Sequence, residues 1–386
     1  MTARLALAAG ELSGDRLGAS LASALYQRDV DVFLSGLTGP AMIEAGVESM
    51  ASIDELGVMG LFEVVSHLPR LMRLRRGLRD RILRGGFDAF VGIDSPDFNL
   101  GLARSLRRAG VPSIQCVAPS VWAWRRYRIP KIARSLDLLL TLLPFEPQLF
   151  RGTGLDARFI GHPLADLLPM EPDRAAARAR LEISGQRPVV ALLPGSRGAE
   201  LDRHAGLIAQ VARKLKRRDD LELLLLLADA RHLERFERRA GCRTEADGIR
   251  VHVGQTQTGL AAADVALTAS GTVTLEALLT KTPMVVFYHL APATYHLARA
   301  LRLVKSRWIS LPNVLAGRSL VPERIQRQAS AEALTTDLLA WLEDSARRAE
   351  FREQASRIHE ILACDAAANA AGHILNCIDA HRATAR

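Results

Sequence analysis

Two acidic side chains stand at the ends of apolar runs in the first half of the sequence. Asp94 follows the run Ala89 to Ile93, and Glu11 follows the run Arg4 to Ala9. A carboxylate that leaves a buried strand and enters a cleft is partly desolvated, which raises its pKa toward the range useful to a general base. Asp94 is therefore the first candidate catalytic residue and Glu11 the second. Turn formation before Pro96 is the alternative explanation for Asp94.

The second half contains two turns, rich in glycine and serine, that are suited to bind phosphate. Each lies between an apolar run and a helical pattern, so backbone amides at the helix start face an anion. Arg197 adds a charged fork to the first turn, and Glu276 could accept hydrogen bonds from ribose hydroxyls in the second. The candidate nucleotide-binding residues of these turns are Gly195, Ser196, Arg197, Ser270, Gly271, Thr272 and Glu276.

Ordinary helix capping explains either turn taken alone. Two anion-binding turns in one domain, however, are what a diphosphonucleoside requires. The turns lack both the GxGxxG pattern and the P-loop Gly-Lys-Ser/Thr, which disfavours NAD binding and ATP hydrolysis. The four cysteines are scattered, and an Asp-x-Asp pair is missing beside the proposed phosphate turns. We therefore expect a metal-independent protein without a cofactor.

A basic amphipathic stretch lies before Asp94. Its apolar residues recur at helical spacing, and arginines from Arg70 to Arg84 flank them. Such a helix is suited to lie in an anionic membrane interface. An ordinary packed helix, with Leu74, Leu78 and Ile82 continuing a buried face, is the alternative. The candidate membrane or acceptor residues here are Val64, Val65, Leu68, Leu71, Met72, Arg73 and Arg76.

Trp122 and Trp124 form a second candidate acceptor or membrane segment, beside Arg125 and Arg126. Their rings could stack on bases or sugars, or lie at the headgroup boundary. The net charge of +9 implies an acidic partner. Because aromatic residues make up only 5% and the densest arginine cluster flanks an apolar stripe, anionic lipid is favoured over nucleic acid.

Continuous apolar runs alternate with amphipathic helical patterns along both halves of the chain. This alternation is typical of parallel βαβ units whose strands are covered on both faces. The predicted fold is α/β, with two tandem Rossmann-like doubly wound domains that face a cleft, followed by C-terminal helices. We expect the domains at 1–165 and 166–350, and the helices at 351–386. No apolar run approaches the roughly 20 residues of a membrane span, so we expect a cytoplasmic protein.

Eight short segments, in this order, resemble the lipid-A-disaccharide synthases, a family of inverting glycosyltransferases with the GT-B architecture. Each segment alone is a weak signal, but together they extend over almost the whole chain and include both tryptophans. The segments are Ala9 to Asp15, Gly92 to Asn99, Pro119 to Arg125, Leu143 to Glu146, Ile160 to Pro163, Leu192 to Arg197, Ala269 to Glu276 and Leu311 to Asn313.

The resemblance implies a specific reaction. UDP-2,3-diacylglucosamine donates its sugar to 2,3-diacylglucosamine 1-phosphate (lipid X), giving a β-1′,6-linked disaccharide and UDP with inversion. By position, Asp94 matches the general base, and Arg197 and Asn313 match polar residues of the donor site.

The family likeness also assigns a role to each part of the chain. Residues 1–165 would bind the acceptor and face the membrane, and residues 166–350 would bind the UDP-sugar. Residues 351–386 would pack back on the N-terminal domain of their own or a partner chain, which leaves a homodimer open. The basic stretch would place the enzyme peripherally on the cytoplasmic face of the inner membrane.

Two other functions are compatible with parts of the sequence. A UDP-sugar 2-epimerase would share the fold but need neither an acceptor nor a membrane segment. A basic RNA- or DNA-binding protein would carry arginines along a track with aromatic platforms. The tryptophan segment and the Asp94 turn disfavour the first, and the arginine distribution disfavours the second.

Overall fold

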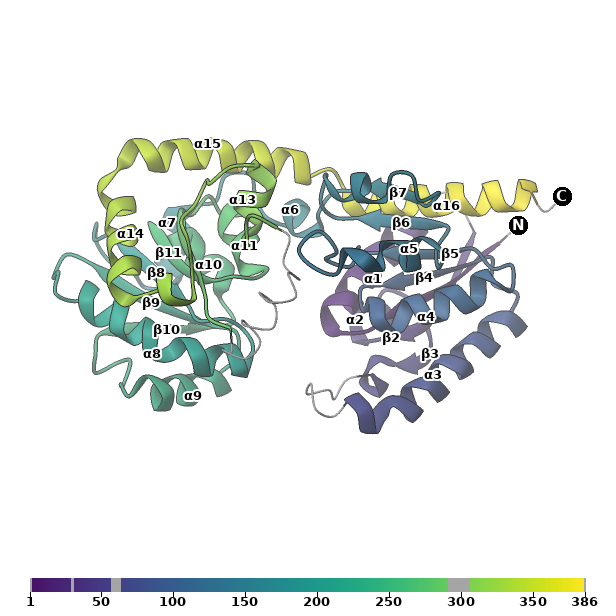
Figure 1. Cartoon of the computed structure of the whole chain (residues 1–386), viewed down its shortest axis with the longest axis horizontal. Helices are drawn as coiled ribbons and strands as arrows, with labels where there is room; N and C mark the ends of the chain where they lie inside the picture. Colours follow the sequence, from purple (N-terminus) through teal and green to yellow (C-terminus); the bar gives the residue numbers. More distant parts are fainter. Residues whose placement is uncertain (1, 29–30, 57–63, 291–305, 385–386) are drawn as a thin grey trace. The chain divides into compact units, whose positions relative to one another are not determined.

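Apolar runs of the sequence form the central strands of two parallel sheets with helices packed around them (Figure 1). The computed structural model describes residues 2–28, 31–56, 64–290 and 306–384, and the side chains of residues 64–68 lie outside the description. The chain divides into two compact units. Unit 1 comprises Met1–Asp166 and Leu362–Arg386, and unit 2 comprises Leu167–Ile361. The predicted class of two doubly wound α/β domains with C-terminal helices is confirmed.

Unit 1 contains a seven-stranded parallel sheet in the order β3-β2-β1-β4-β5-β6-β7. The strands are β1 (Ala3–Ala9), β2 (Val32–Thr38), β3 (Glu48–Ser52), β4 (Ala89–Ile93), β5 (Ser113–Cys116), β6 (Leu138–Thr141) and β7 (Asp156–Phe159). The helices are α1 (Leu12–Tyr26), α2 (Pro40–Glu44), α3 (Val64–Arg84), α4 (Pro96–Arg107), α5 (Ile129–Ala133), α6 (Pro163–Leu167) and α16 (Ala366–Thr384).

Unit 2 contains a six-stranded parallel sheet in the order β10-β9-β8-β11-β12-β13. The strands are β8 (Val189–Leu193), β9 (Glu222–Leu227), β10 (Ile249–Val253), β11 (Val265–Ala269), β12 (Met284–Tyr288) and β13 (Glu323–Ile325). The helices are α7 (Arg174–Arg180), α8 (Gly198–Leu215), α9 (Arg231–Ala240), α10 (Thr256–Ala262), α11 (Val273–Leu279), α13 (Leu311–Ala316), α14 (Ala331–Glu343) and α15 (Ser345–Leu362).

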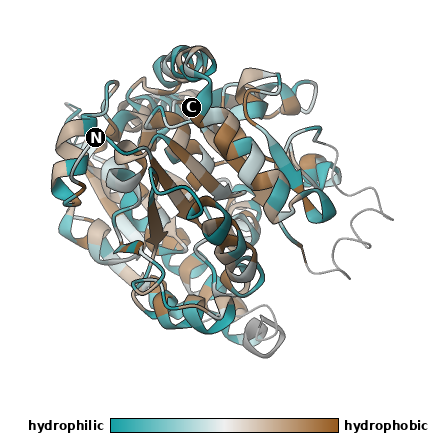
Figure 2. Cartoon of the chain, turned by 90° about the vertical axis from the view of Figure 1, so that its left-hand side faces the viewer, coloured by the Kyte–Doolittle hydropathy of each residue, from teal (hydrophilic) through white to brown (hydrophobic). Residues whose placement is uncertain are grey.

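The central strands are apolar on both faces because helices cover both sides of each sheet. Every residue of β4, β8 and β11 is buried. In Figure 2 the apolar central strands are brown, whereas many outward helix surfaces are teal. Burial of these runs explains why they are continuously apolar rather than alternating.

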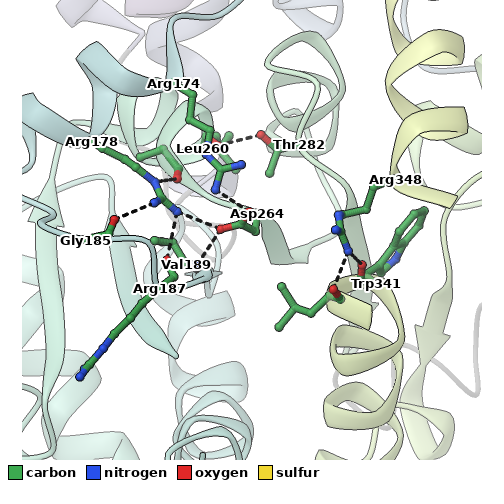
Figure 3. A network of polar contacts seen from close by, with 12 residues as sticks. Arg174, Arg178, Gly185, Arg187, Val189, Leu260, Asp264, Thr282, Trp341 and Arg348 are labelled. Carbon is green, nitrogen blue, oxygen red and sulfur yellow. Dashed lines mark hydrogen bonds and ion pairs between the residues drawn. The ribbon is translucent and has the colours of Figure 1, made fainter. Parts of the chain in front are cut away.

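A polar network fixes the amino ends of two central strands in unit 2 (Figure 3). Asp264, which directly precedes β11, accepts hydrogen bonds from the backbone of Val189 at 2.8 Å and from Arg178 at 3.0 Å. Arg178 of α7 also donates to the backbone carbonyls of Gly185 and Arg187. This network stabilises the strand ends opposite to the turns that the sequence proposes for ligands.

Each sheet has one topological switch point, where the strand order reverses. In unit 1 it lies between β1 and β4, and in unit 2 it lies between β8 and β11. In doubly wound folds, ligands bind outside the carboxyl ends of the strands at such points. All four turns proposed to carry chemistry begin at these strand ends.

The C-terminal helices belong to different units. Helix α15 lies in unit 2 up to Ile361, and α16 lies in unit 1, where it packs against α1 and β6. By length and composition, the stretch Ser345–Thr384 could cross a membrane, and it is the one such stretch among the described residues. By length and composition, the expectation that no segment is long and apolar enough to span a membrane is therefore wrong. Core helices pass the same test, and Ala370, Ile374 and Ile378 of α16 are buried in unit 1.

Candidate active site

The turn between β4 and α4 places Asp94 at the switch point of unit 1. Its side chain is partly buried, and its backbone φ is +51°, followed by +40° at Ser95. The backbone N–H of Asp94 donates to Cys116 at 3.0 Å, which anchors the turn to β5. Two consecutive residues in the left-handed region are uncommon outside glycine, so the surrounding structure must impose this conformation.

Glu11 lies at the end of the neighbouring strand. It is the exposed N-cap residue of α1, one position after Gly10. A Cβ atom on Gly10 would lie 2.3 Å from the Cβ of Ser95, and one on Gly14 would lie 3.7 Å from the Cβ of Asp94. These glycines allow the β1–α1 turn to pack directly against the Asp94 turn. The structure therefore brings both candidate carboxylates to the same edge of the sheet.

Asp15, one turn further along α1, has a different role. Its buried carboxylate accepts backbone hydrogen bonds from Gly39 at 2.8 Å, Ala41 at 2.8 Å and Met42 at 3.1 Å. These bonds satisfy the amides at the start of α2. Asp15 thus fixes the β2–α2 turn and is a structural acid.

A cavity of about 330 Å³ opens at the switch point of unit 2. It brings together the residues that the sequence proposed for the nucleotide, from the β8–α8 and β11–α11 turns. Leu226, Ala228, Thr256 and Val273 add an apolar and hydroxyl lining. The proposed residues that line the cavity are Gly195, Ser196, Arg197, Ser270, Gly271, Thr272 and Glu276.

The first phosphate-binding turn depends on a glycine and a buried histidine. Gly195 has a φ of +109°, which a residue with a side chain rarely adopts. Nδ1 of the fully buried His204 donates to the carbonyl of Pro194 at 2.7 Å, and its Nε2 accepts from the backbone of His289 at 3.3 Å. The bond that Nε2 accepts requires neutral imidazole with its proton on Nδ1, and burial lowers the pKa of His204. His204 therefore positions this turn from beneath.

A carboxylate and a phenol that line the cavity were among the residues missed by the sequence reasoning. Glu200 and Tyr288 both line the cavity, and the hydroxyl of Tyr288 donates to Oε1 of Glu200 at 3.1 Å. The guanidinium of Arg197, which is largely exposed, lies 3.8 Å from the same carboxylate. Glu200 lies in the first turn of α8, three residues after the N-cap residue Arg197. This i, i+3 spacing was the signal in the sequence that the two side chains could meet.

Glu276 lines the cavity from α11. Its side chain is partly buried, and this burial raises the pKa of its carboxyl. A carboxylate at this depth can accept two hydrogen bonds from the vicinal hydroxyls of a ribose. The hydroxyls would replace part of the water that burial removes from Glu276.

Asn313 is not among the described residues that line the cavity. It is fully buried, and its Oδ1 accepts from the backbone of Leu320 at 2.7 Å and of Val321 at 2.8 Å. Its Nδ2 donates to the carbonyl of Val321 and to Glu323, both at 2.9 Å. The structure therefore places Asn313 inside the 309–323 segment rather than with the donor residues.

That segment nevertheless reaches the cavity through Ser270. The carboxylate of Glu323 accepts from the backbone of Ile309 and Ser310, at 3.0 and 2.9 Å. The hydroxyl of Ser270 donates to the carbonyl of Ile309 at 2.8 Å. Ser270 thus offers the cavity neither a free hydroxyl nor a free amide, because its backbone N–H donates to the carbonyl of Phe287 at 3.0 Å.

The tryptophan segment follows β5 in unit 1. The partly buried ring of Trp122 packs edge-on against Phe145, with centroids 5.8 Å apart. Trp124 is 43% exposed, and the Arg125 guanidinium lies 4.0 Å from the centroid of its ring. Tyr127 is also exposed. Aromatic surface in this loop is therefore open to a ligand or an interface.

The apolar stripe of α3 is directed at the core of unit 1 over its described part. Leu71 and Leu74 pack against the core, and Leu78 and Ile82 are buried in it. The packed-helix alternative therefore accounts for these four residues. Met72, Arg73 and Arg76 are exposed, whereas the side chains of Val64, Val65 and Leu68 lie outside the described residues.

Groups of three or more His, Cys, Asp or Glu side chains that could hold a metal ion do not occur within the described ranges.

Comparison with known proteins identifies close relatives. The family model described as lipid-A-disaccharide synthetase matches residues 5–374. A lipid-A-disaccharide synthase of Pseudomonas aeruginosa (strain UCBPP-PA14) is 45% identical over 377 residues, which cover 97% of this chain and 98% of that protein.

Solved structures share the fold at low sequence identity. A putative UDP-N-acetylglucosamine 2-epimerase from Listeria monocytogenes superposes with a TM-score of 0.64 at 13% identity, covering 99% of this chain and 97% of that chain. The calicheamicin glycosyltransferase CalG4 superposes with a TM-score of 0.57 at 15% identity, covering 98% of each chain. At these identities the likeness concerns the fold alone, which an epimerase and a glycosyltransferase both share.

Proposed function

This chain belongs to the lipid-A-disaccharide synthetase family, and from that premise we propose that it forms the β-1′,6 disaccharide of lipid A. UDP-2,3-diacylglucosamine is the donor and 2,3-diacylglucosamine 1-phosphate the acceptor. The acceptor 6-hydroxyl forms a bond to the anomeric carbon with inversion, and the bond from that carbon to the diphosphate oxygen breaks. The observation that carries the proposal is the cavity at the β8/β11 switch point, lined by both predicted phosphate turns.

In unit 2 the donor diphosphate would bind the amides of the Gly195 and Ser270 turns, with Arg197 balancing the charge of the departing UDP. Glu276 would accept hydrogen bonds from the ribose. Fixed amide dipoles and a guanidinium stabilise a leaving diphosphate because they need little reorganisation as its charge develops.

In unit 1 we assign proton removal from the acceptor hydroxyl to Asp94. The proton passes to its carboxylate while the hydroxyl oxygen attacks, a role that typically contributes about 10²–10⁴ in rate. We assign Glu11, on the adjacent strand end, as the second catalytic carboxylate. The position of both residues at the β1/β4 switch point supports this assignment.

A UDP-release assay with the acylated donor in detergent micelles tests the proposal. We expect release to require the acceptor and to produce a disaccharide detectable by mass spectrometry. Asp94→Asn should lower turnover by at least ~10²-fold while the Kd for UDP stays within about twofold. Near-normal turnover of this variant would exclude Asp94 as the base. UDP-sugar conversion without an acceptor would instead support a 2-epimerase.

We further propose that unit 1 docks on the anionic cytoplasmic face of the inner membrane. Its exposed Met72, Trp124 and Tyr127, with Arg73 and Arg76, combine apolar and basic surface. Co-flotation with vesicles that contain anionic phospholipid, compared with neutral vesicles, tests this. Binding equal to that of neutral vesicles would reject it. A homodimer through exchange of α16 stays a prediction that light scattering can check.

A further inference from the structure

The backbone at Asp94 is held by two buried side-chain amides. The carbonyl oxygen of Asp94 accepts a hydrogen bond of 2.9 Å from Nδ2 of Asn99 and another of 2.9 Å from Nε2 of Gln115. Asn99 lies in the first turns of α4, and Gln115 lies in β5. Both side chains are fully buried. We call Asn99 and Gln115 the amide pair.

The same amide nitrogens also approach the ends of the neighbouring strands. Nδ2 of Asn99 lies 3.1 Å from the carbonyl oxygen of Ala8, and Nε2 of Gln115 lies 3.1 Å from that of Cys116. Because only carbonyl oxygens surround these atoms, each must be the NH₂ end of its amide. The amide pair therefore joins the ends of β1, β4 and β5 around the Asp94 carbonyl.

The sequence reserves space for this pair. A Cβ atom on Gly92 would lie 2.7 Å from Oε1 of Gln115 and 2.8 Å from Cβ of Asn99. Any larger residue at position 92 would displace the two amides from the Asp94 carbonyl. Glycine inside a strand usually weakens it. At position 92 of β4, glycine is required because it leaves room for the amide pair.

Stability alone does not explain the pair. Oδ1 of Asn99 and Oε1 of Gln115 are buried and lack a hydrogen-bond partner among the described residues. Buried polar atoms of this kind reduce stability, and they concentrate where a structure serves another purpose. The left-handed conformations of Asp94 and Ser95 are unfavourable as well. All these unfavourable features lie at or next to Asp94.

We propose that Asn99 and Gln115 are positioning residues for the proposed base, an inference that rests on the proposed role of Asp94. By binding the Asp94 carbonyl from two sides, they fix the left-handed backbone and hence the direction in which its carboxylate leaves β4. Loss of either donor frees the peptide to rotate, so the carboxylate loses its alignment with the acceptor hydroxyl while the donor cavity of unit 2 is unaffected.

The test uses Asn99→Leu and Gln115→Met, which keep side-chain volume and remove the amide donors. The matched control is Ser113→Ala. Ser113 lies in the same strand as Gln115, is equally buried, and donates to the carbonyl of Ala103 at 2.9 Å, away from Asp94. The measurements are kcat, the KM for both substrates, the Kd for UDP and the Tm of each variant.

We expect both amide-pair variants to lose about 10–10²-fold in kcat, with the Kd for UDP within twofold of the parent. The acidic limb of the kcat/KM pH profile should move, because the environment of the base changes. Ser113→Ala should keep kcat despite a comparable fall in Tm. A kcat within twofold of the parent, or a loss that Ser113→Ala reproduces, overturns the inference.

Asp94→Asn is measured in parallel to separate the two claims. If Asp94→Asn is inactive and the amide-pair variants are normal, only the positioning role is wrong. If Asp94→Asn is fully active, the base assignment fails and the positioning role fails with it. If Gln115→Met does not fold, isosteric Gln115→Glu replaces it. In Gln115→Glu, the protonated carboxyl can still donate a hydrogen bond to the Asp94 carbonyl. We therefore expect kcat to fall as pH rises through the pKa of that carboxyl. A flat profile at full activity contradicts the inference.

Discussion

Substitution of Gly10 by alanine tests whether the two strand-end turns of unit 1 act together. The added Cβ would lie 1.9 Å from Oγ of Ser95 and 2.3 Å from its Cβ. The hydroxyl can rotate away, but the Cβ of Ser95 is fixed to the backbone. Because ordinary contacts of a Cβ atom begin near 3.4 Å, the turns must separate by about 1 Å.

A displacement of about 1 Å at a reacting group costs roughly 10²-fold in rate, or about 2.7 kcal/mol in transition-state stabilisation. We therefore expect Gly10→Ala to lower kcat for UDP release by about two orders of magnitude. The Kd for UDP, measured by calorimetry, should not change because Gly10 lies in unit 1 and the cavity lies in unit 2.

The double variant Gly10→Ala/Ser95→Gly decides between local crowding and general damage. Removal of the Ser95 side chain leaves its Cα, at 3.7 Å, as the nearest atom of residue 95, which is an ordinary contact. Glycine also tolerates the φ of +40° at position 95. We expect kcat to recover, and Gly206→Ala in α8, whose Cβ would meet its nearest atom at 4.0 Å, to be neutral. A double variant no better than Gly10→Ala would refute the reasoning.

Two further predictions concern buried groups. Burial raises the pKa of Glu146 from its usual 4.5 to about 8, so between these pH values the folded chain retains a proton that the unfolded chain has released. Stability from this group is present below pH 4.5 and is lost as pH rises to about 8, by up to about 1.4 kcal/mol per pH unit. Glu146→Gln should remove this slope in denaturant titrations at pH 5 to 8, and parallel slopes for parent and variant would contradict it. Asn313→Ala leaves the buried amides of Leu320 and Val321 without their acceptor, so we expect about 3 kcal/mol of destabilisation by urea unfolding. Weaker UDP binding should follow through Ile309 and Ser270, and unchanged UDP affinity would argue against that connection.

The central strands and the edge strands β7 and β10 were predictable from the sequence, whereas the edge strands β3 and β13 were not. Runs such as Ala89 to Ile93 are buried on both faces and therefore continuously apolar. Strands β3 and β13 were missed because they lie at sheet edges and also lack an apolar run: Glu48 and Ser49 are exposed, and Glu323 serves as a hydrogen-bond acceptor. In such a polar edge strand, pairing with one neighbour rather than burial decides the conformation, and pairing leaves little trace in hydrophobic patterning.

The turns at the switch points were predictable for a related reason. Their glycines, serines and charged residues immediately follow apolar runs, and parallel topology brings the carboxyl ends of the strands to one edge. Asn313 shows the limit of this reasoning. The family resemblance suggested a donor-site contact for it, but its four hydrogen bonds all go to protein groups within ten residues along the chain.

By itself, the sequence determined the two parallel sheets, the turns at the switch points and the family, because periodicity, turn chemistry and motif order are local properties. Only the tertiary structure decided which polar side chains face a cavity and which bind the backbone. Asn99 and Gln115 lie in segments that the sequence treats as a helix and a strand, and their convergence on the Asp94 carbonyl depends on β4 and β5 being neighbours. Long-range pairing sets that contact, and local patterning carries no record of it.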